Sequence, residues 1–142
     1  MPSLLSDQPG LHNIVGFHDG YLSGFRASRR GDVNIWCWTR AEDEYLITIP
    51  GPGMLRVSSF TGANIINVIN IYDAPHCPRR LYAEISGLGE EQFKPVLDSR
   101  FQQFKTNNGK LIEIATSDGC LFLATFEGAV NSIQIIRADD RS

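Results

Sequence analysis

Two short clusters hold the side chains of this sequence that are best suited to chemistry. His18 and Asp19 are adjacent and precede Gly20, and His76 and Cys77 are adjacent in a segment bounded by prolines. A histidine beside a carboxylate can bind a metal or transfer protons, and a thiol beside an imidazole can act as a nucleophile. Both pairs also have a structural interpretation. Adjacent residues on a strand point to opposite faces, and an aspartate before glycine commonly stabilises a turn. We therefore expect Asp19 to accept hydrogen bonds from backbone N–H groups.

The cysteines indicate reduced thiols. The chain has three of them, Cys37, Cys77 and Cys120, with no CxxC spacing. An odd number in one domain favours free thiols and an intracellular setting. Arg79 and Arg80 follow Cys77 closely and favour its thiolate form. We therefore expect Cys77 to react first with an alkylating agent.

A zinc site is the obvious metal hypothesis, and the spacing does not support it. The residues that could contribute fit no regular zinc-binding motif; they are His12, His18, Asp73, His76 and Cys77. The sequence also lacks a P-loop, a dinucleotide fingerprint, a GxSxG elbow and an HExxH motif. We predict no metal and no cofactor, and we favour a protein without catalysis.

Trp36 and Trp38 are candidates for a binding surface. They share one face of a predicted strand, with Asn34 and Arg40 nearby. Exposed tryptophans near an arginine are typical of interface anchors. Large aromatic residues also fill the space between the sheets of a sandwich, and we favour that role here.

The sequence predicts a mainly β fold of about eight to ten antiparallel strands with one short helix. These strands would form a sandwich or a partly open barrel. Asn108-Gly109, Asp118-Gly119 and Glu127-Gly128 separate short β-branched and aromatic segments, which indicates hairpins. We expect strands at 79–85 and 100–106, and the helix at 89–98. A longer helix through Phe104 remains the alternative, because apolar residues there also follow helical spacing.

Composition suits one domain that can bury a core. We predict a flexible lead-in at 1–10, a single β domain at 11–138 and a polar tail at 139–142.

The net charge of −3 argues against nucleic-acid binding. No segment predicts export or a membrane span, so we expect a cytoplasmic protein. Apolar residues occupy both faces of 33–39 and 63–72, which predicts a two-layer sandwich or a homodimer.

The segment HDGYL, from His18 to Leu22, opens an alternating strand, followed by a charged hairpin, an Ile- and Asn-rich strand and a C-terminal meander. This order resembles small bacterial β-sheet proteins in the immunity-protein families of polymorphic toxin systems. His18, Asp19 and Leu22 carry the match. The resemblance implies a protein that neutralises a cognate toxin by binding it, without catalysis.

The alternative function is a small enzyme or ligand-binding β-barrel with a pocket near His18, His76 and Cys77. A convergent cluster of titratable residues in a deep cavity would favour this alternative. A broad exposed aromatic or acidic patch would favour the interaction protein.

Overall fold

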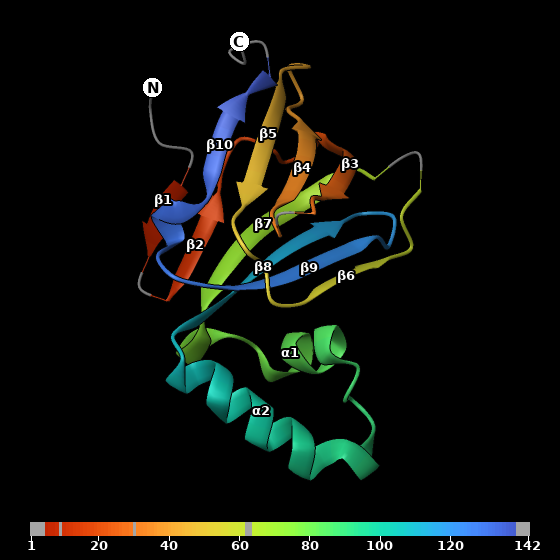
Figure 1. Cartoon of the computed structure of the whole chain (residues 1–142). Coiled ribbons are helices and arrows are strands. Elements are labelled where there is room, and N and C mark those ends of the chain that lie inside the picture. Colours follow the sequence, from red (N-terminus) through yellow and green to blue (C-terminus); the bar gives the residue numbers. More distant parts are fainter. Residues whose placement is uncertain (1–4, 9, 30, 62–63, 139–142) are drawn as a thin grey trace.

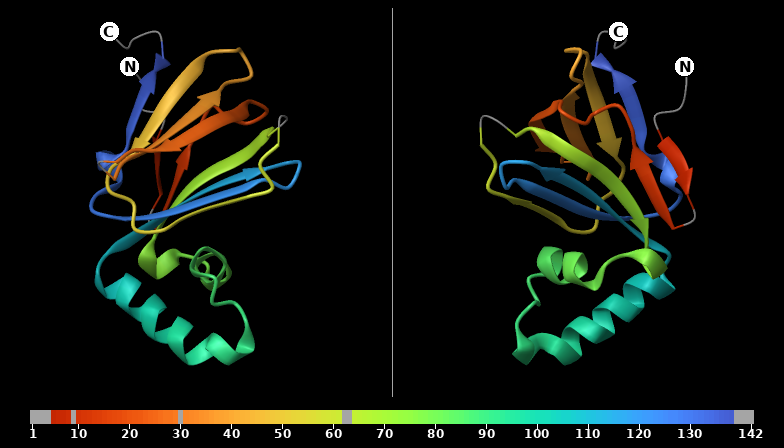
Figure 2. Two further views of the ribbon diagram at one scale, coloured as in Figure 1. Left: turned by 45° about the vertical axis from the view of Figure 1, so that its right-hand side comes forward. Right: turned by 180° about the vertical axis from the view of Figure 1, so that it is seen from behind.

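The structure is a computed structural model that describes residues 5–8, 10–29, 31–61 and 64–138 of the chain. Two antiparallel sheets stack to form a β-sandwich, and two helices cover the outer face of the larger sheet (Figure 1). The described chain therefore has three layers, and the outer face of the smaller sheet is uncovered (Figure 2). This is the mainly β sandwich that the sequence predicts, and the sheets are not closed into a barrel.

Ten strands are assigned in the described ranges. They are β1 (Leu5–Gln8), β2 (Leu11–Ile14), β3 (Tyr21–Ala27), β4 (Val33–Trp38), β5 (Glu44–Ile49), β6 (Leu55–Ser58), β7 (Ile66–Asp73), β8 (Gly109–Thr116), β9 (Leu121–Glu127) and β10 (Gln134–Arg137). The larger sheet, which we call sheet A, has the order β1-β2-β7-β8-β9-β6. The smaller sheet, sheet B, has the order β10-β5-β4-β3.

The main core lies between the two sheets, because each strand alternates its side chains. In β4, Val33, Ile35 and Cys37 are fully buried while the residues between them are only half-buried. In β8, by contrast, successive residues such as Leu111 and Ile112 are both buried. Sheet B covers one face of β8 and the helices cover the other, so this strand has no solvent-facing side.

The helical layer is larger than the sequence predicts. The helices are α1 (Arg79–Ser86) and α2 (Lys94–Thr106), and three 3₁₀ turns are η1 (Ala74–His76), η2 (Glu91–Phe93) and η3 (Val130–Ser132). Their apolar residues pack on sheet A in a second cluster, which includes Leu81, Ile85, Leu97, Phe101, Leu111 and Leu123.

Three local expectations are wrong. Residues 79–85 form α1 and not a strand, because Leu81, Tyr82 and Ile85 have the i, i+1, i+4 spacing of one helical face. Residues 100–106 belong to α2, so the helix runs past its expected end at 98. Asn108-Gly109 joins this helix to β8 and closes no hairpin.

Part of the expected lead-in lies in a strand. Residues 5–8, expected within the lead-in, form β1 and pair with β2. Residues 1–4 and 9 of that lead-in, and the tail at 139–142, lie outside the described residues.

Candidate functional site

His18 and Asp19 lie in the turn before β3. The side chains are 70% and 50% exposed, and His18 Nε2 is 3.6 Å from Asp19 Oδ1. His18 Nδ1 is 3.0 Å from the carbonyl oxygen of Asn67. Asp19 has a φ of +65°, and its backbone N–H donates to Ile66 O at 3.0 Å. The backbone of Asp19 joins the two sheets, while its carboxylate faces His18 and not the backbone donors that we expected.

Cys77 is buried against the helical layer. Its side chain belongs to the apolar cluster between the helices and sheet A, and the residue is 6% exposed. Burial, and to a lesser extent the charge of the nearby Glu113, raise the pKa of the Cys77 thiol to about 12. The expectation of an activated thiol beside Arg79 and Arg80 is therefore wrong, because desolvation disfavours the thiolate more than the positive charge of Lys105 favours it.

The sequence candidates do not converge on one site. His18 contacts the beginning of β7, whereas His76 and Cys77 follow its end, roughly 20 Å away by strand geometry. His76 is exposed and its ring packs over Gly10, while Cys77 points under the helices. The three residues that the sequence grouped around one pocket therefore lie apart in the structure.

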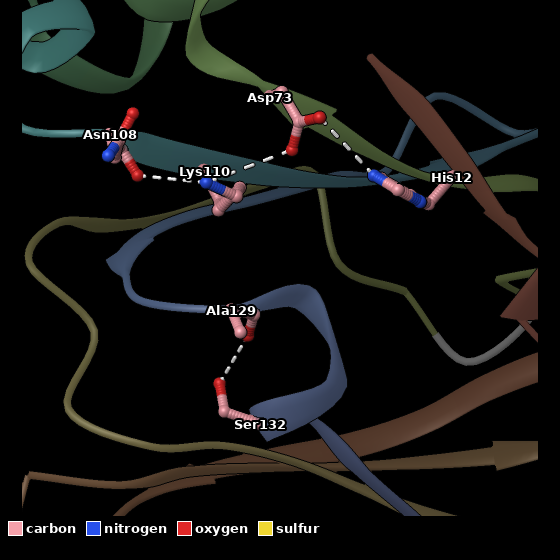
Figure 3. A network of polar contacts seen from close by, with 6 residues as sticks. All are labelled: His12, Asp73, Asn108, Lys110, Ala129 and Ser132. Carbon is pink, nitrogen blue, oxygen red and sulfur yellow. Dashed lines mark hydrogen bonds and ion pairs between the residues drawn. The ribbon is translucent and has the colours of Figure 1, made fainter. Parts of the chain in front are cut away.

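A different pocket lies at the edge of the sandwich, near the end of β7 (Figure 3). Asp73 lies between two partners: His12 Nε2 is 3.4 Å from its Oδ2, and Lys110 Nζ is 3.8 Å from its Oδ1. Lys110 also donates to the carbonyl oxygen of Asn108 at 2.9 Å. The pocket has a volume of about 700 Å³ and is also lined by His76. That volume lies within the usual range of small-ligand pockets.

The geometry of this pocket suits binding better than acid–base catalysis. His12 Nε2 faces Asp73, and its other ring nitrogen, Nδ1, is buried from solvent. A histidine base oriented by a carboxylate needs its second nitrogen within reach of the substrate. The sequence suggested His12 and Asp73 only as metal ligands and His76 also as a partner of Cys77. It gave no signal for Lys110, which comes from a strand far along the chain.

A buried polar network lies on the opposite face of sheet A, beside the helices. Glu113 is 7% exposed and accepts hydrogen bonds from the hydroxyl of Tyr72 at 3.0 Å and from Nδ2 of Asn70 at 3.3 Å. Asn13 donates to Asn70, so the network crosses β2, β7 and β8. Burial raises the pKa of Tyr72, and the negative charge of Glu113 adds to the effect. A buried carboxylate with such partners is a structural element of the sheet.

Trp36 and Trp38 lie on the outer face of sheet B. Cross-strand neighbours share a face, and β4 pairs Trp36 with Leu46 and Trp38 with Glu44. Both tryptophans are half-buried, and no described element covers them (Figure 2). The expectation that they fill the space between the sheets is therefore wrong, because Val33, Ile35 and Cys37 take the inner face.

The outer face of sheet B carries a continuous apolar surface. Tyr21 stacks on Trp38 with ring centroids 5.9 Å apart and an interplanar angle of 9°. Leu46 of β5 is the cross-strand neighbour of Trp36 on one side and of Ile136 in β10 on the other. We call this surface the aromatic face, and its members are Tyr21, Trp36, Trp38, Leu46 and Ile136.

A shallow depression borders the aromatic face at the turn between β4 and β5. It has a volume of about 220 Å³ and is lined by Trp38, Glu42, Asp43, Glu44, Arg137 and Ala138. Arg137 forms an ion pair with Asp43 at 2.7 Å. We call this feature the acidic depression, because three of its six lining residues are carboxylates.

The described residues contain no group of three or more His, Cys, Asp or Glu side chains placed to hold a metal ion. None of the helices in the described ranges has both the length and the apolar character that crossing a bilayer requires. Comparisons of the chain with protein-family models, with curated proteins and with solved structures found no match.

Proposed function

We propose that this chain is a non-enzymatic bacterial interaction protein that binds a partner protein through the aromatic face. One observation carries the proposal: two half-buried tryptophans and a tyrosine lie on a sheet face that no described element covers. Tryptophan and tyrosine supply much of the binding energy of protein interfaces, because each buries a large rigid ring at a low entropic cost.

The immunity-protein resemblance supports a specific kind of partner. The HDGYL segment that carries it begins in the turn before β3 and includes Tyr21, a member of the aromatic face. We therefore propose that the partner is a cognate toxin and that binding alone neutralises it. A gene for such a toxin is expected immediately upstream in the source genome.

Co-expression with the upstream gene product tests this proposal. The chain should restore growth to cells that express the toxin and should form a complex with it. Trp36→Ala and Trp38→Ala should each weaken the complex by about ten-fold or more, as interface anchors do. Phe93→Ala and Val96→Ala are matched controls, because both side chains are exposed on the helical layer. Equal binding by all four variants would refute the role of the aromatic face.

The pocket at His12, Asp73 and Lys110 supports a second candidate, the binding of a small polar ligand. Its volume of about 700 Å³ and its titratable side chains favour this function. A panel of nucleotides, sugar phosphates and amino acids, screened by thermal shift, tests it. A ligand of this pocket should raise the melting temperature of the wild type but not of Lys110→Met. Stabilisation that persists in this variant would place the ligand elsewhere.

A further inference from the structure

The acidic depression has an aromatic wall, because Trp38 is one of its lining residues. Trp38 lies between β3 and β5, and Tyr21 of β3 stacks on it nearly in parallel, at 9°. Tyr21 therefore covers one face of the indole. On the side of Trp38 away from β3, Glu44 of β5 is the direct cross-strand neighbour. The lining of the depression agrees with this arrangement, because it contains Trp38 and Glu44 together.

The charge of the depression is negative after its internal ion pair is counted. Asp43 is neutralised by Arg137. Glu42 and Glu44 form no ion pair with the part of the chain that the structure describes. Arg40, in the same turn, is exposed and does not line the depression. Two carboxylates thus remain beside the half-buried indole of Trp38.

We propose that the acidic depression is a subsite for a basic side chain of the partner, arginine above all; this inference rests on the proposed function of the aromatic face. A guanidinium can stack on the indole of Trp38 and donate two parallel hydrogen bonds to the carboxylate of Glu44. Its charge complements Glu42 and Glu44, whereas an acidic side chain would be repelled. The partner is therefore a protein whose contact surface projects an arginine at the edge of an apolar patch.

A second copy of the chain fits this surface less well. A two-fold dimer through the aromatic face would need a cation opposite Glu44, and the only basic residue in the described rows of that face is Arg26, at the far end of β3.

The indole signals of Trp36 and Trp38 in a ¹H–¹⁵N spectrum report on the subsite in the full chain. The probe is N-acetylarginine amide, and the matched neutral probe is N-acetylcitrulline amide. We expect the Trp38 signal to move with the arginine probe and to move far less with citrulline. Trp36 is the internal control, because it lies on the same face of the same strand but does not line the depression.

A carboxylate variant then tests the electrostatic part. Glu44→Gln should weaken binding of the arginine probe by about two- to five-fold, the range of exposed cation–π and ion-pair contacts. Glu91→Gln, an exposed carboxylate at the helical layer, should leave binding unchanged. Thermal melts check that both variants fold. Equal responses to arginine and citrulline, or unchanged binding by folded Glu44→Gln, would overturn the subsite. A dimer by light scattering that Trp38→Ala dissociates would overturn it too, in favour of a second copy.

Failure of the subsite and failure of the proposed function give different results. If Trp38→Ala abolishes partner binding but Glu44→Gln does not, the aromatic face binds the partner without an arginine contact. If neither variant affects partner binding, the aromatic face is not the interface, and both proposals fall.

Discussion

The network around Glu113 offers a quantitative test of the structure, through the substitution Tyr72→Phe. The change removes one hydroxyl group, which donates to Glu113 at 3.0 Å and lies 3.2 Å from Nδ2 of Asn70. Glu113 is 7% exposed, so solvent cannot replace the lost donor fully. Asn70 still donates to the carboxylate at 3.3 Å. Loss of one of two partners of a buried carboxylate should cost about 1–3 kcal/mol of unfolding free energy.

Urea denaturation at pH 7 measures this cost. With an ordinary urea dependence for a small domain, the midpoint should fall by roughly 1 M. Tyr21→Phe is the matched control, because its ring is exposed on the aromatic face, and it should change stability by less than about 0.5 kcal/mol. In a double-mutant cycle with Glu113→Gln, the two changes should be less than additive. A Tyr72→Phe variant as stable as the wild type would refute the reasoning.

The pH dependence gives the same test a second readout. Burial, and then the charge of Glu113, raise the pKa of Tyr72 above its ordinary value of 10.0. The folded state therefore favours the neutral phenol. The stability that the raised pKa of Tyr72 contributes is fully present below pH 10 and is lost as the pH rises through the folded-state pKa. The stability gap between the wild type and Tyr72→Phe should consequently narrow above pH 10.

Three further predictions concern other parts of the fold. Burial raises the pKa of the Cys37 thiol from 9.0 to about 12, so the stability that this thiol contributes, on the order of 4 kcal/mol, should be fully present below pH 9 and be lost between pH 9 and 12, as denaturation at stepped pH would show. Gly109→Ala should lower the melting temperature, because its Cβ would lie 2.2 Å from the ring of Phe104. Asp19 has a φ of +65°, so Asp19→Ala should destabilise the fold by about 1 kcal/mol while Asp19→Gly should not; equal melts would contradict this.

Local patterns predicted the strands well where one face is buried. The alternation of β4 and the Asp118-Gly119 turn between β8 and β9 follow directly from the residues, and the structure contains both. The same reasoning failed at 79–85. That segment is short and rich in apolar residues, and its helical spacing becomes decisive only because sheet A offers an apolar surface to pack against.

The candidate sites were harder to predict than the fold. The alternation of side chains along β4 showed that Trp36 and Trp38 share one face of the strand. It could not show whether that face is turned toward another layer or toward solvent. That depends on which sheet the helices cover, and the helices pack on sheet A. The cluster at Asp73 is a similar case. Its contacts, His12 and Lys110, lie 61 and 37 positions away in the chain, and only the pairing of β2, β7 and β8 brings them together.

The uneven covering of the two sheets is the strongest reason to look for a partner on sheet B. The outer face of sheet A carries apolar side chains that include Leu111 and Leu123, and the chain covers them with α1 and α2. Sheet B also has an apolar outer row, Trp36, Leu46 and Ile136, yet no described helix packs there. Exposed aromatic side chains on a flat sheet reduce solubility and favour nonspecific association. Within the described residues one apolar outer face is covered and the other is open, and we therefore expect another protein to cover the open face.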